Sequence, residues 1–543
     1  MRVTRILILV GFLFPCLRCH TQGDKLVNCI IPQPVEMQAG KGIFLLDEKT
    51  VVQYDPGNRE MAQVAETLLR DLDHYAGVRV TMDRAGKGNK VIRLELSAES
   101  DLPEEGYLMN ITPREIIIRG TSAQGIFFGL QTLKQLILTS DLKGRGIPVP
   151  SLMIRDYPRF AWRGMHLDTG RHFYTVDSLK RFIDYLATYK LNRFHWHLTD
   201  DQGWRIEIKQ YPMLTETGSR RKETIIGYTR DVPKKYDGIP YGGFYTRDEI
   251  RDVVSYASAR YITVVPEIEM PGHAQAAIAA YPELGVTGDK VEVLTEWGVS
   301  PVIFKPSEEV FLFLETVLTE VLGLFPSEYI HIGGDEAIKN QWKASAEVQN
   351  QMKKLGLNNE DELQSWFIRR IEKFLNDRGR KLIGWDEILQ GGLAPNATVM
   401  SWHGIKKGIE AAEMGHDVIM TPNSHLYFSY YQADPATEPP ASRAGTTRID
   451  KVYSYDPIPA ELAPEKQRHI LGVQACLWTE QMKTFRKVEY MMFPRITALA
   501  ELAWTPANGK NYEDFSRRLL KQERLFRVLG VNYSRSGMPI VGN

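Results

Sequence analysis

A regular alternation of short apolar runs and helix-like segments begins near residue 160 and constrains the fold more than any other feature of the chain. Each run has the length of a buried strand, and most are followed by an amphipathic stretch such as residues 176–190. The eight runs are WRGMHLD, NRFHWHLTD, ITVVPEIEM, YIHIGGDE, KLIGWDEI, TVMSWHG, DVIMTP and ILGVQACLWTE. Strands and helices alternating in this way over residues 157–505 predict an α/β fold with a (β/α)8 TIM-type barrel.

The preceding part of the chain has a different composition, because all ten tryptophans lie between Trp162 and Trp504. Residues 23–156 combine strand-like runs with two amphipathic helix patterns and predict a small two-layer α/β domain. Since this segment carries no cluster of catalytic residue types, we expect it to support the barrel. Residues 506–543 predict a C-terminal helical segment that packs on the barrel or contacts a partner, with packing as the preferred alternative.

Residues 1–22 have the pattern of a signal peptide, because two arginines precede an apolar run at residues 6–14 that is too short to span a bilayer. We therefore expect export to the periplasm or the cell surface. Cys16 or Cys19 could carry a lipid anchor, although neither follows the small residues that usually precede a lipidated cysteine.

The charge balance excludes one class of partner. Lys and Arg together number 67, as do Asp and Glu, so the formal net charge is zero. Nucleic-acid binding relies on a basic surface, so we expect no nucleic-acid partner and favour an uncharged or locally charged ligand.

Carboxylates, histidines and aromatic rings follow the predicted strands, at the end of the barrel where active sites form. They are Asp168, Arg171, Asp200, Asp201, Glu269, His273, Asp335, Glu336, Trp385, Asp386, Glu387, Trp402, His403, Trp478 and Glu480. Flat rings can cover the apolar face of a sugar while carboxylates and arginine bind its hydroxyls. This combination predicts a sugar site.

Asp335 and Glu336 stand side by side after two glycines, and two interpretations are open. Acidic residues are common in the first turn of a helix. Glycoside cleavage, however, needs a protonated carboxyl and a group that stabilises the developing positive charge. An adjacent pair could supply both, and burial beside a second negative charge would raise the pKa of the acid.

Two competing functions remain. His195 and His197 share one face of a predicted strand, as metal-ligating pairs do in some barrel hydrolases, with His273 and Asp335 as further ligands; packing inside the barrel is the simpler alternative. A non-catalytic glycan-binding protein is the second competitor.

The long segment at residues 218–245, rich in Gly and Tyr, is either a functional rim loop or a flexible surface insertion.

Six motifs in order, RGMHLDTGRHF, HWHLTDDQGWR, EIEMPGH, HIGGDE, GWDEI and LWTE, resemble glycoside hydrolase family 20, the β-N-acetylhexosaminidases. The resemblance implies an exo-acting enzyme that removes terminal N-acetyl-D-hexosamine from glycans with no metal or other cofactor. It also implies a retaining mechanism in which the acetamide of the substrate attacks its own anomeric carbon to give an oxazolinium intermediate. Glu336 would be the general acid and Asp335 would orient the acetamide.

The same resemblance implies roles for the sugar-binding residues. Arg171 would hold the 3- and 4-hydroxyls, and Asp200 with His273 would form a polar relay beside the acid. The remaining positions are Trp366, Trp385 and Trp478 as walls, Tyr427 as a donor to the acetamide oxygen, and Glu480 as an acceptor for outer hydroxyls.

Ser429 departs from the family pattern, which has an aspartate there that accepts hydrogen bonds from the 4- and 6-hydroxyls. The substitution removes an acceptor and a repulsive charge. Our hypothesis is that the pocket tolerates a 6-sulfated N-acetylglucosamine; replacement of the lost contact by serine or water is the alternative.

Overall fold

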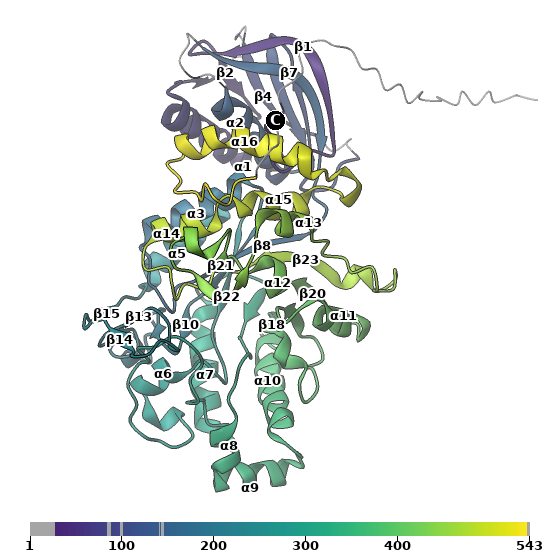
Figure 1. Cartoon of the computed structure of the whole chain (residues 1–543). Helices are drawn as coiled ribbons and strands as arrows, with labels where there is room; N and C mark the ends of the chain where they lie inside the picture. Colours follow the sequence, from purple (N-terminus) through teal and green to yellow (C-terminus); the bar gives the residue numbers. More distant parts are fainter. Residues whose placement is uncertain are drawn as a thin grey trace, which may run out of the picture.

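The computed structural model describes residues 28–83, 88, 90–97, 101–140, 142 and 146–539. The predicted signal peptide, with Cys16 and Cys19, lies outside this range. A sheet-containing N-terminal domain is stacked on one end of a barrel (Figure 1).

The predicted barrel is confirmed, because each of the eight apolar runs contributes one strand to a closed parallel barrel. The strands are β8 (Trp162–Asp168), β9 (Arg193–His197), β16 (Thr263–Glu267), β17 (Tyr329–His331), β18 (Lys381–Trp385), β19 (Thr398–Ser401), β20 (Val418–Met420) and β23 (Ile470–Ala475). The barrel closes where β23 pairs with β8. Their residues are almost all buried because the barrel interior and the outer helices cover both faces.

Amphipathic helices form the outer layer, and side-chain caps set where several of them begin. Thr175, Ser307 and Asn359 accept hydrogen bonds from the first turns of α3, α7 and α10, and Thr246 with Glu249 forms a capping box at α5. The barrel helices are α3 (Val176–Thr188), α4 (Met213–Glu216), α5 (Arg247–Ser258), α6 (Gln275–Ala280), α7 (Glu308–Leu322), α8 (Asn340–Ala344), α9 (Ala346–Leu355), α10 (Glu360–Asn376), α11 (Ile405–Glu413), α12 (Asn423–Leu426), α13 (Ile449–Ser454), α14 (Phe485–Met492) and α15 (Arg495–Trp504).

The N-terminal domain is a seven-stranded mixed sheet in the order β1-β7-β5-β6-β4-β2-β3, with helices α1 and α2. Its elements are β1 (Glu36–Leu46), β2 (Val51–Gln53), α1 (Arg59–Asp71), β3 (Thr81–Met82), β4 (Val91–Leu96), β5 (Tyr107–Ile111), β6 (Glu115–Gly120), α2 (Ala123–Thr139) and β7 (Ile147–Asp156). Helix α2, capped by Ser122, is buried along nearly its whole length because it lies between the sheet, α3 and the C-terminal helix α16 (Tyr512–Val528).

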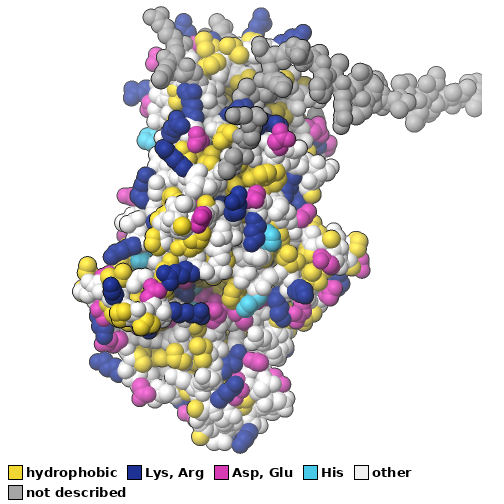
Figure 2. Space-filling model, in the orientation of Figure 1, with side chains coloured by type: hydrophobic (Ala, Val, Ile, Leu, Met, Phe, Trp, Pro, Cys, Tyr) yellow, Lys and Arg dark blue, Asp and Glu magenta, His cyan; other side chains and the backbone are white. Residues whose placement is uncertain are grey.

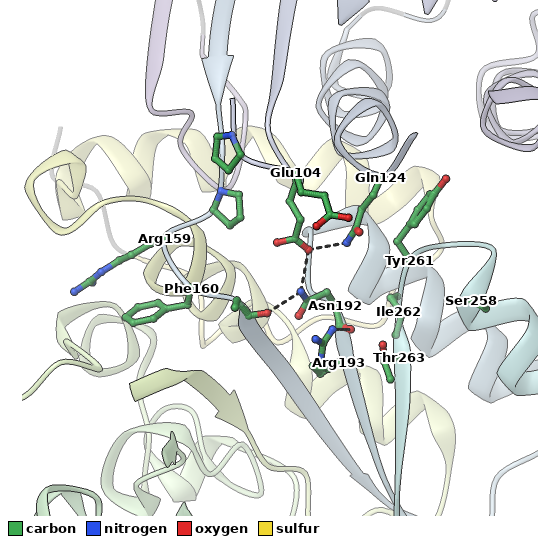
Figure 3. Close-up of a pocket in the computed structure, with 14 residues that line it drawn as sticks. Glu104, Gln124, Arg159, Phe160, Asn192, Arg193, Ser258, Tyr261, Ile262 and Thr263 are labelled. Atoms are coloured by element: carbon green, nitrogen blue, oxygen red, sulfur yellow. Dashed lines mark hydrogen bonds between the residues drawn. The ribbon is translucent and has the colours of Figure 1, made fainter. Parts of the chain in front are cut away.

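The two domains meet at the end of the barrel where the strands begin. Arg163 in β8 binds Glu105 through Nη1 and Nη2 at 2.7 and 3.0 Å, and the fully buried Lys190 lies 2.7 Å from Asp156. A cavity of about 620 Å³ opens at this junction (Figure 3). Glu105 on its wall is bonded to Gln124 and Asn192, so this pocket is part of the junction between the domains.

Helix α16 differs from its expected position. We predicted packing on the barrel, but the helix packs mainly against α2 of the N-terminal domain and also contacts α13 (Figure 1). Arg518 on α16 donates to the carbonyl of Ile30 and forms an ion pair with Glu501 on α15, while Gln522 donates to Gln135. Arg518 and Gln522 lie four residues apart on one face of the helix, and through these contacts they tie the domains together.

None of the helices in the described part of the chain combines the length and apolar character needed to cross a membrane. Figure 2 shows basic and acidic side chains interspersed over the visible face, which agrees with the balanced sequence charge.

Candidate active site

The ends of five barrel strands surround a cavity of about 250 Å³ at the rim opposite the N-terminal domain. It is lined by Arg171, Asp335, Glu336, Trp402, Tyr427, Ser429, Tyr430, Ser442, Ala444, Trp478 and Glu480. Seven of these residues were predicted from the sequence with a specific role, and they come from loops after β8, β17, β20 and β23; Trp402, after β19, was predicted only as a strand-end residue. The barrel thus brings together side chains that lie more than 300 residues apart in the chain.

A tight turn, and not a helix, presents the two adjacent carboxylates. Gly333, Gly334 and Glu336 have φ angles of +67°, +89° and +46°, and α8 begins only at Asn340. A Cβ atom on Gly333 would lie 1.6 Å from a carboxylate oxygen of Glu269. The helix-first-turn interpretation of Asp335 and Glu336 is therefore wrong, and the glycines are needed for both backbone angle and close approach.

Asp335 lies at the base of the cavity with an unused acceptor. Its Oδ1 is buried and has no hydrogen-bond partner among the described residues. Burial, followed by the negative charges of Glu387 and Glu336, raises the pKa of Asp335 to about 8 even though His273 opposes the shift. A buried carboxyl oxygen without a donor suits a ligand that carries an N–H group.

Glu336 is the more open member of the pair, with 41% of its side chain exposed. Burial would raise its pKa, but His273, whose Nε2 lies 3.5 Å from Oε2, and the charge of Arg171 outweigh burial and lower it. Our expectation of a raised pKa at Glu336 is therefore wrong for this structure. The raised pKa belongs to Asp335, because Asp335 is buried more deeply and interacts with the negative charges of Glu387 and Glu336.

Asp200 connects Arg171 with His273, the histidine beside Glu336. Arg171 Nη1 lies 2.7 Å from Asp200 Oδ2, and its Nε donates to Gln202 at 3.0 Å. His273 Nδ1 lies 3.2 Å from Asp200 Oδ1. Burial would lower the pKa of His273, but the surrounding carboxylates, Asp200 first, raise it well above its usual value. His273 is therefore a cation that faces both Asp335 and Glu336.

The three tryptophans proposed as walls occupy three different places. Trp478 lines the cavity, and Trp385 lies fully buried beneath it at a ring separation of 5.7 Å. Trp366 does not reach the cavity. It sits half-buried on α10 and packs edge-to-face against Phe311 of α7 at 5.3 Å, because that face of the helix points toward α7. The prediction of Trp366 as a wall is not supported by this structure.

Trp402 takes a wall position, although we predicted no specific role for it from the sequence. Its ring is nearly parallel to that of Tyr427 at 6.0 Å, and its Nε1 donates to Glu387 at 2.9 Å. The position of Trp402 directly after β19 was a usable signal, since strand-end residues face the rim. Tyr430 was harder to foresee, because it begins a strand of only two residues, β21 (Tyr430–Tyr431), which is too short to show a periodic pattern.

The insertion at residues 218–245 forms an ordered wall beside the site. It contains β12 (Arg220–Arg221) paired with β15 (Tyr241–Gly242), and β13 (Ile225–Ile226) paired with β14 (Lys235–Tyr236). Tyr228 in this segment donates to the carbonyl of Ala441 at 2.6 Å. These contacts favour the rim-loop interpretation over the flexible insertion.

A second cavity of about 460 Å³ adjoins the first. The two share Ser429, Ser442, Ala444, Trp478 and Glu480, and the second is also lined by Tyr228, Arg230, Trp297 and Arg443. The guanidiniums of Arg230 and Arg443 are exposed. Ser429 therefore stands where the deep pocket opens into a wider space with positive charge on its border.

His195 and His197 face protein groups at hydrogen-bonding distance. Both ring nitrogens of His197 meet carboxylates, Glu267 on one side and Asp200 at 2.7 Å on the other. His195 accepts from Gln474 through Nδ1 at 2.9 Å and has Nε2 3.1 Å from Glu267. A metal ligand needs a free nitrogen lone pair directed at the ion, and His197 offers none. The pair does not fit the metal-hydrolase alternative.

Comparison with known proteins adds an independent finding. The family model described as glycosyl hydrolase family 20, catalytic domain, matches residues 160–507, and that of domain 2 of the same family matches residues 28–157. A β-hexosaminidase of Porphyromonas gingivalis is 45% identical over 519 residues, covering 94% of this chain and 64% of that protein. A β-hexosaminidase of Vibrio furnissii is 36% identical, covering 88% of this chain and 76% of that protein.

A solved structure is also similar throughout. The Vibrio harveyi exo-β-N-acetylglucosaminidase in complex with N-acetylglucosamine has a TM-score of 0.83 and 33% identity, covering 94% of this chain and 79% of that chain. The chain described here spans about two thirds of the length of the P. gingivalis relative, which is the longer protein.

Proposed function

Because the chain belongs to glycosyl hydrolase family 20 and is thereby a glycoside hydrolase, we propose that it removes single terminal N-acetyl-D-hexosamine residues from the non-reducing ends of glycans. The cavity of about 250 Å³ is smaller than the roughly 300–1,000 Å³ pockets that hold drug-sized ligands. That size suits one sugar residue and supports exo action.

The unpartnered Oδ1 of Asp335 carries the mechanistic part of the proposal. The acetamide N–H of the sugar donates to this oxygen, which turns the acetamide carbonyl oxygen toward the anomeric carbon. That oxygen forms the new bond to the anomeric carbon while the bond to the leaving oxygen breaks, and Glu336 protonates the leaving group. The product of this step is an oxazolinium ion, whose positive charge Asp335 stabilises.

Water then completes the reaction. Glu336, now ionised, takes a proton from water as the water attacks the anomeric carbon and opens the oxazolinium ring. Two displacements at one carbon give net retention. Polar atoms of His273, Asp335 and Glu336 all lie within 4.8 Å of one another, so the group that holds the acetamide and the group that protonates the leaving oxygen can act on the same sugar residue.

Sugar binding also accounts for the protonation states of the pair. An N–H that donates to Asp335 favours its ionised form and lowers its pKa from about 8. The same sugar covers the exposed part of Glu336 and raises its pKa by desolvation. Binding therefore lowers the pKa of Asp335 and raises that of Glu336, so the proton is held by Glu336, which donates it to the leaving oxygen.

The other cavity residues fix the sugar. Arg171 and Glu480 provide a donor and an acceptor for ring hydroxyls, Tyr427 provides an O–H for the acetamide oxygen, and Trp478 covers an apolar face. These roles assign contacts to the acetamide, to ring hydroxyls and to one apolar face of a single N-acetylhexosamine.

Glu336→Gln tests this assignment with p-nitrophenyl N-acetyl-β-D-glucosaminide in the presence of EDTA. We expect wild-type turnover to persist under chelation and the variant to lose about 10²–10⁴-fold in kcat. The exposed Glu283→Gln is the matched control and should behave like wild type. Full activity of Glu336→Gln would refute the acid assignment, and loss of wild-type activity in EDTA would favour a metal enzyme.

We also propose that a substituent on the 6-position, such as a sulfate, is accepted. Ser429 opens the deep pocket toward the second cavity, and Arg230 and Arg443 border that space. Arg443 is held by Asp231 at 2.9 Å, whereas Arg230 is exposed. A sulfate on the 6-position would extend past Ser429 into the second cavity, where Arg230 and Arg443 lie.

The 6-sulfated and unsulfated p-nitrophenyl substrates test this directly. We expect both to be cleaved, and Arg230→Ala to lower kcat/KM for the sulfated one alone. Cleavage of the unsulfated substrate with none of the sulfated one would mean that Ser429 or water merely replaces a lost contact.

Export is proposed from the sequence of residues 1–22. Cell fractionation and the mass of the mature N-terminus test it, and a lipid-modified cysteine would appear as a mass increase at Cys16 or Cys19.

A further inference from the structure

A row of buried charged side chains runs from the centre of the barrel to the general acid. Glu267 ends β16 and contacts His197 Nδ1; His197 Nε2 lies 2.7 Å from Asp200 Oδ2. Asp200 Oδ1 lies 3.2 Å from His273 Nδ1, and His273 Nε2 lies 3.5 Å from Glu336. The first four members are almost completely buried. We call Glu267, His197, Asp200 and His273 the buried charge row.

We propose that Glu267 and His197 are positioning residues for catalysis, which hold Asp200, and through it His273, in the geometry that serves Glu336. The proposal rests on the proposed role of Glu336. It adds two residues, Glu267 and His197, to those that serve catalysis. Both lie below the cavity, and neither contacts Glu336.

Hydrogen bonding fixes the charge of His197. Ionised carboxylates only accept hydrogen bonds, so a ring with a carboxylate on each side must carry a proton on both nitrogens. Burial would lower the pKa of His197, but Glu267 and Asp200 raise it to about 10. His197 is therefore an imidazolium ion that links two carboxylates and needs both of them.

His195 provides an internal contrast on the same strand. It also faces Glu267, at 3.1 Å, but its other nitrogen accepts from the neutral Gln474. Burial lowers the pKa of His195 to about 4, so this ring is neutral. One carboxylate is therefore not enough to keep the buried His195 charged, whereas two carboxylates keep the buried His197 charged.

Other titratable groups also surround His197. Glu269 Oε1 lies 3.9 Å from Nδ1, and the His166 ring lies 5.6 Å away. Burial, with Asp335 next, raises the pKa of Glu269 well above its usual value, and burial lowers that of His166 well below. These shifts favour the uncharged form of each group, so Glu267 and Asp200 remain the carboxylates that hold the proton on His197.

The consequence for catalysis is positional and electrostatic. Asp200 is shared by Arg171, His197 and His273, so a displaced Asp200 would move both a sugar-binding arginine and the cation beside Glu336. No proton has to travel along the row, because His197 keeps both of its protons throughout. The row instead keeps His273 charged and in place while Glu336 gains and loses its proton.

Glu267→Gln and His197→Gln test the proposal on the full chain, with His195→Gln as the matched buried control. We expect kcat to fall about 10–100-fold in the first two, as for other orienting partners of active-site ligands, with a smaller change in KM. In Glu267→Gln the pKa of His197 should fall, so its kcat profile should gain an ionisation between about pH 5 and 8, with activity lost as pH rises. His195→Gln should retain the wild-type shape of the profile.

A purely structural role would lower the melting temperature of all three variants and leave every pH profile unchanged, and that result would overturn the proposal. Glu336→Gln is measured in parallel. If Glu336→Gln is inactive while Glu267→Gln and His197→Gln match wild type, this inference fails and the proposed function stands; if Glu336→Gln is active, the proposed function fails first.

The charge of His197 can also be measured in the wild-type protein, so this test does not depend on whether a variant folds. ¹⁵N spectra of histidine-labelled protein at pH 8.5 should contain at least two imidazolium rings, those of His197 and His273. Fewer than two would overturn the proposal.

Discussion

At the scale of single residues, environment separates two carboxyls that the sequence presents as equals. Asp335 and Glu336 are adjacent, yet one has a raised pKa and the other a lowered one. The sequence identified the pair but could not assign these shifts, because His273, Arg171 and Glu387 reach the pair only in the folded barrel. The same applies to Trp366, whose direction depends on the rotation of α10 against α7.

Asp335→Asn should stabilise the protein at high pH while abolishing most activity. The pKa of Asp335 is about 8 in the folded state and about 3.9 when unfolded. The folded state therefore binds more protons between these values, and stability decreases as pH rises through that window. Asparagine removes this effect, so the melting temperature of the variant should exceed that of wild type at pH 8.5 and match it near pH 4. An equal difference at both pH values would contradict the pKa assignment.

At the scale of elements, the eight barrel strands could be predicted because apolar runs and amphipathic helices alternate with little interruption. The order of strands around the barrel followed from the fold class alone. The shape of the loop after β17 could be anticipated only in part: the paired glycines indicated a sharp turn, but the left-handed backbone of Glu336 itself depends on contacts made by other loops.

Gly333→Ala should disable this turn. The added methyl group would meet Glu269 at 1.6 Å in a backbone with φ of +67°, so both a clash and backbone strain arise. Gly356→Ala is a matched control, because φ is +69° and nothing lies within 4 Å of the added atom.

The control should lose about 1–2 kcal/mol of stability from backbone strain alone, with normal kcat. Gly333→Ala should lose more stability in urea unfolding and most of its activity. Equal losses in the two variants would show that close approach to Glu269 plays no part.

At the scale of the whole molecule, the catalytic rim and the domain junction lie at opposite ends of the barrel. Composition predicted two domains, since tryptophan is confined to residues 162–504. It could not predict how α16 spans them, because an amphipathic helix fits any apolar surface of suitable shape. The junction depends on a few buried polar contacts, among which Lys190, Asp156 and Trp504 are joined by hydrogen bonds.

Lys190→Met should lower stability and leave catalysis intact. It leaves the buried Asp156 carboxylate without its cation, a loss that typically costs about 3–5 kcal/mol. The exposed Lys222→Met, which removes a solvent-exposed pair with Glu292, should change the free energy of unfolding little. Both variants should retain wild-type kcat/KM at 25 °C. A fall in kcat/KM for Lys190→Met would show that the junction acts on the rim.

We propose that the acetamide of the substrate is the nucleophile, and the rate of cleavage of p-nitrophenyl glucosaminides whose N-acetyl group carries zero, one, two or three fluorines tests this. Fluorine withdraws electron density from the carbonyl oxygen, so kcat should fall steeply with each substitution while the first-formed sugar keeps the β configuration. A rate that is insensitive to fluorination would show that a group of the enzyme or water attacks the anomeric carbon, and would contradict the role given to Asp335.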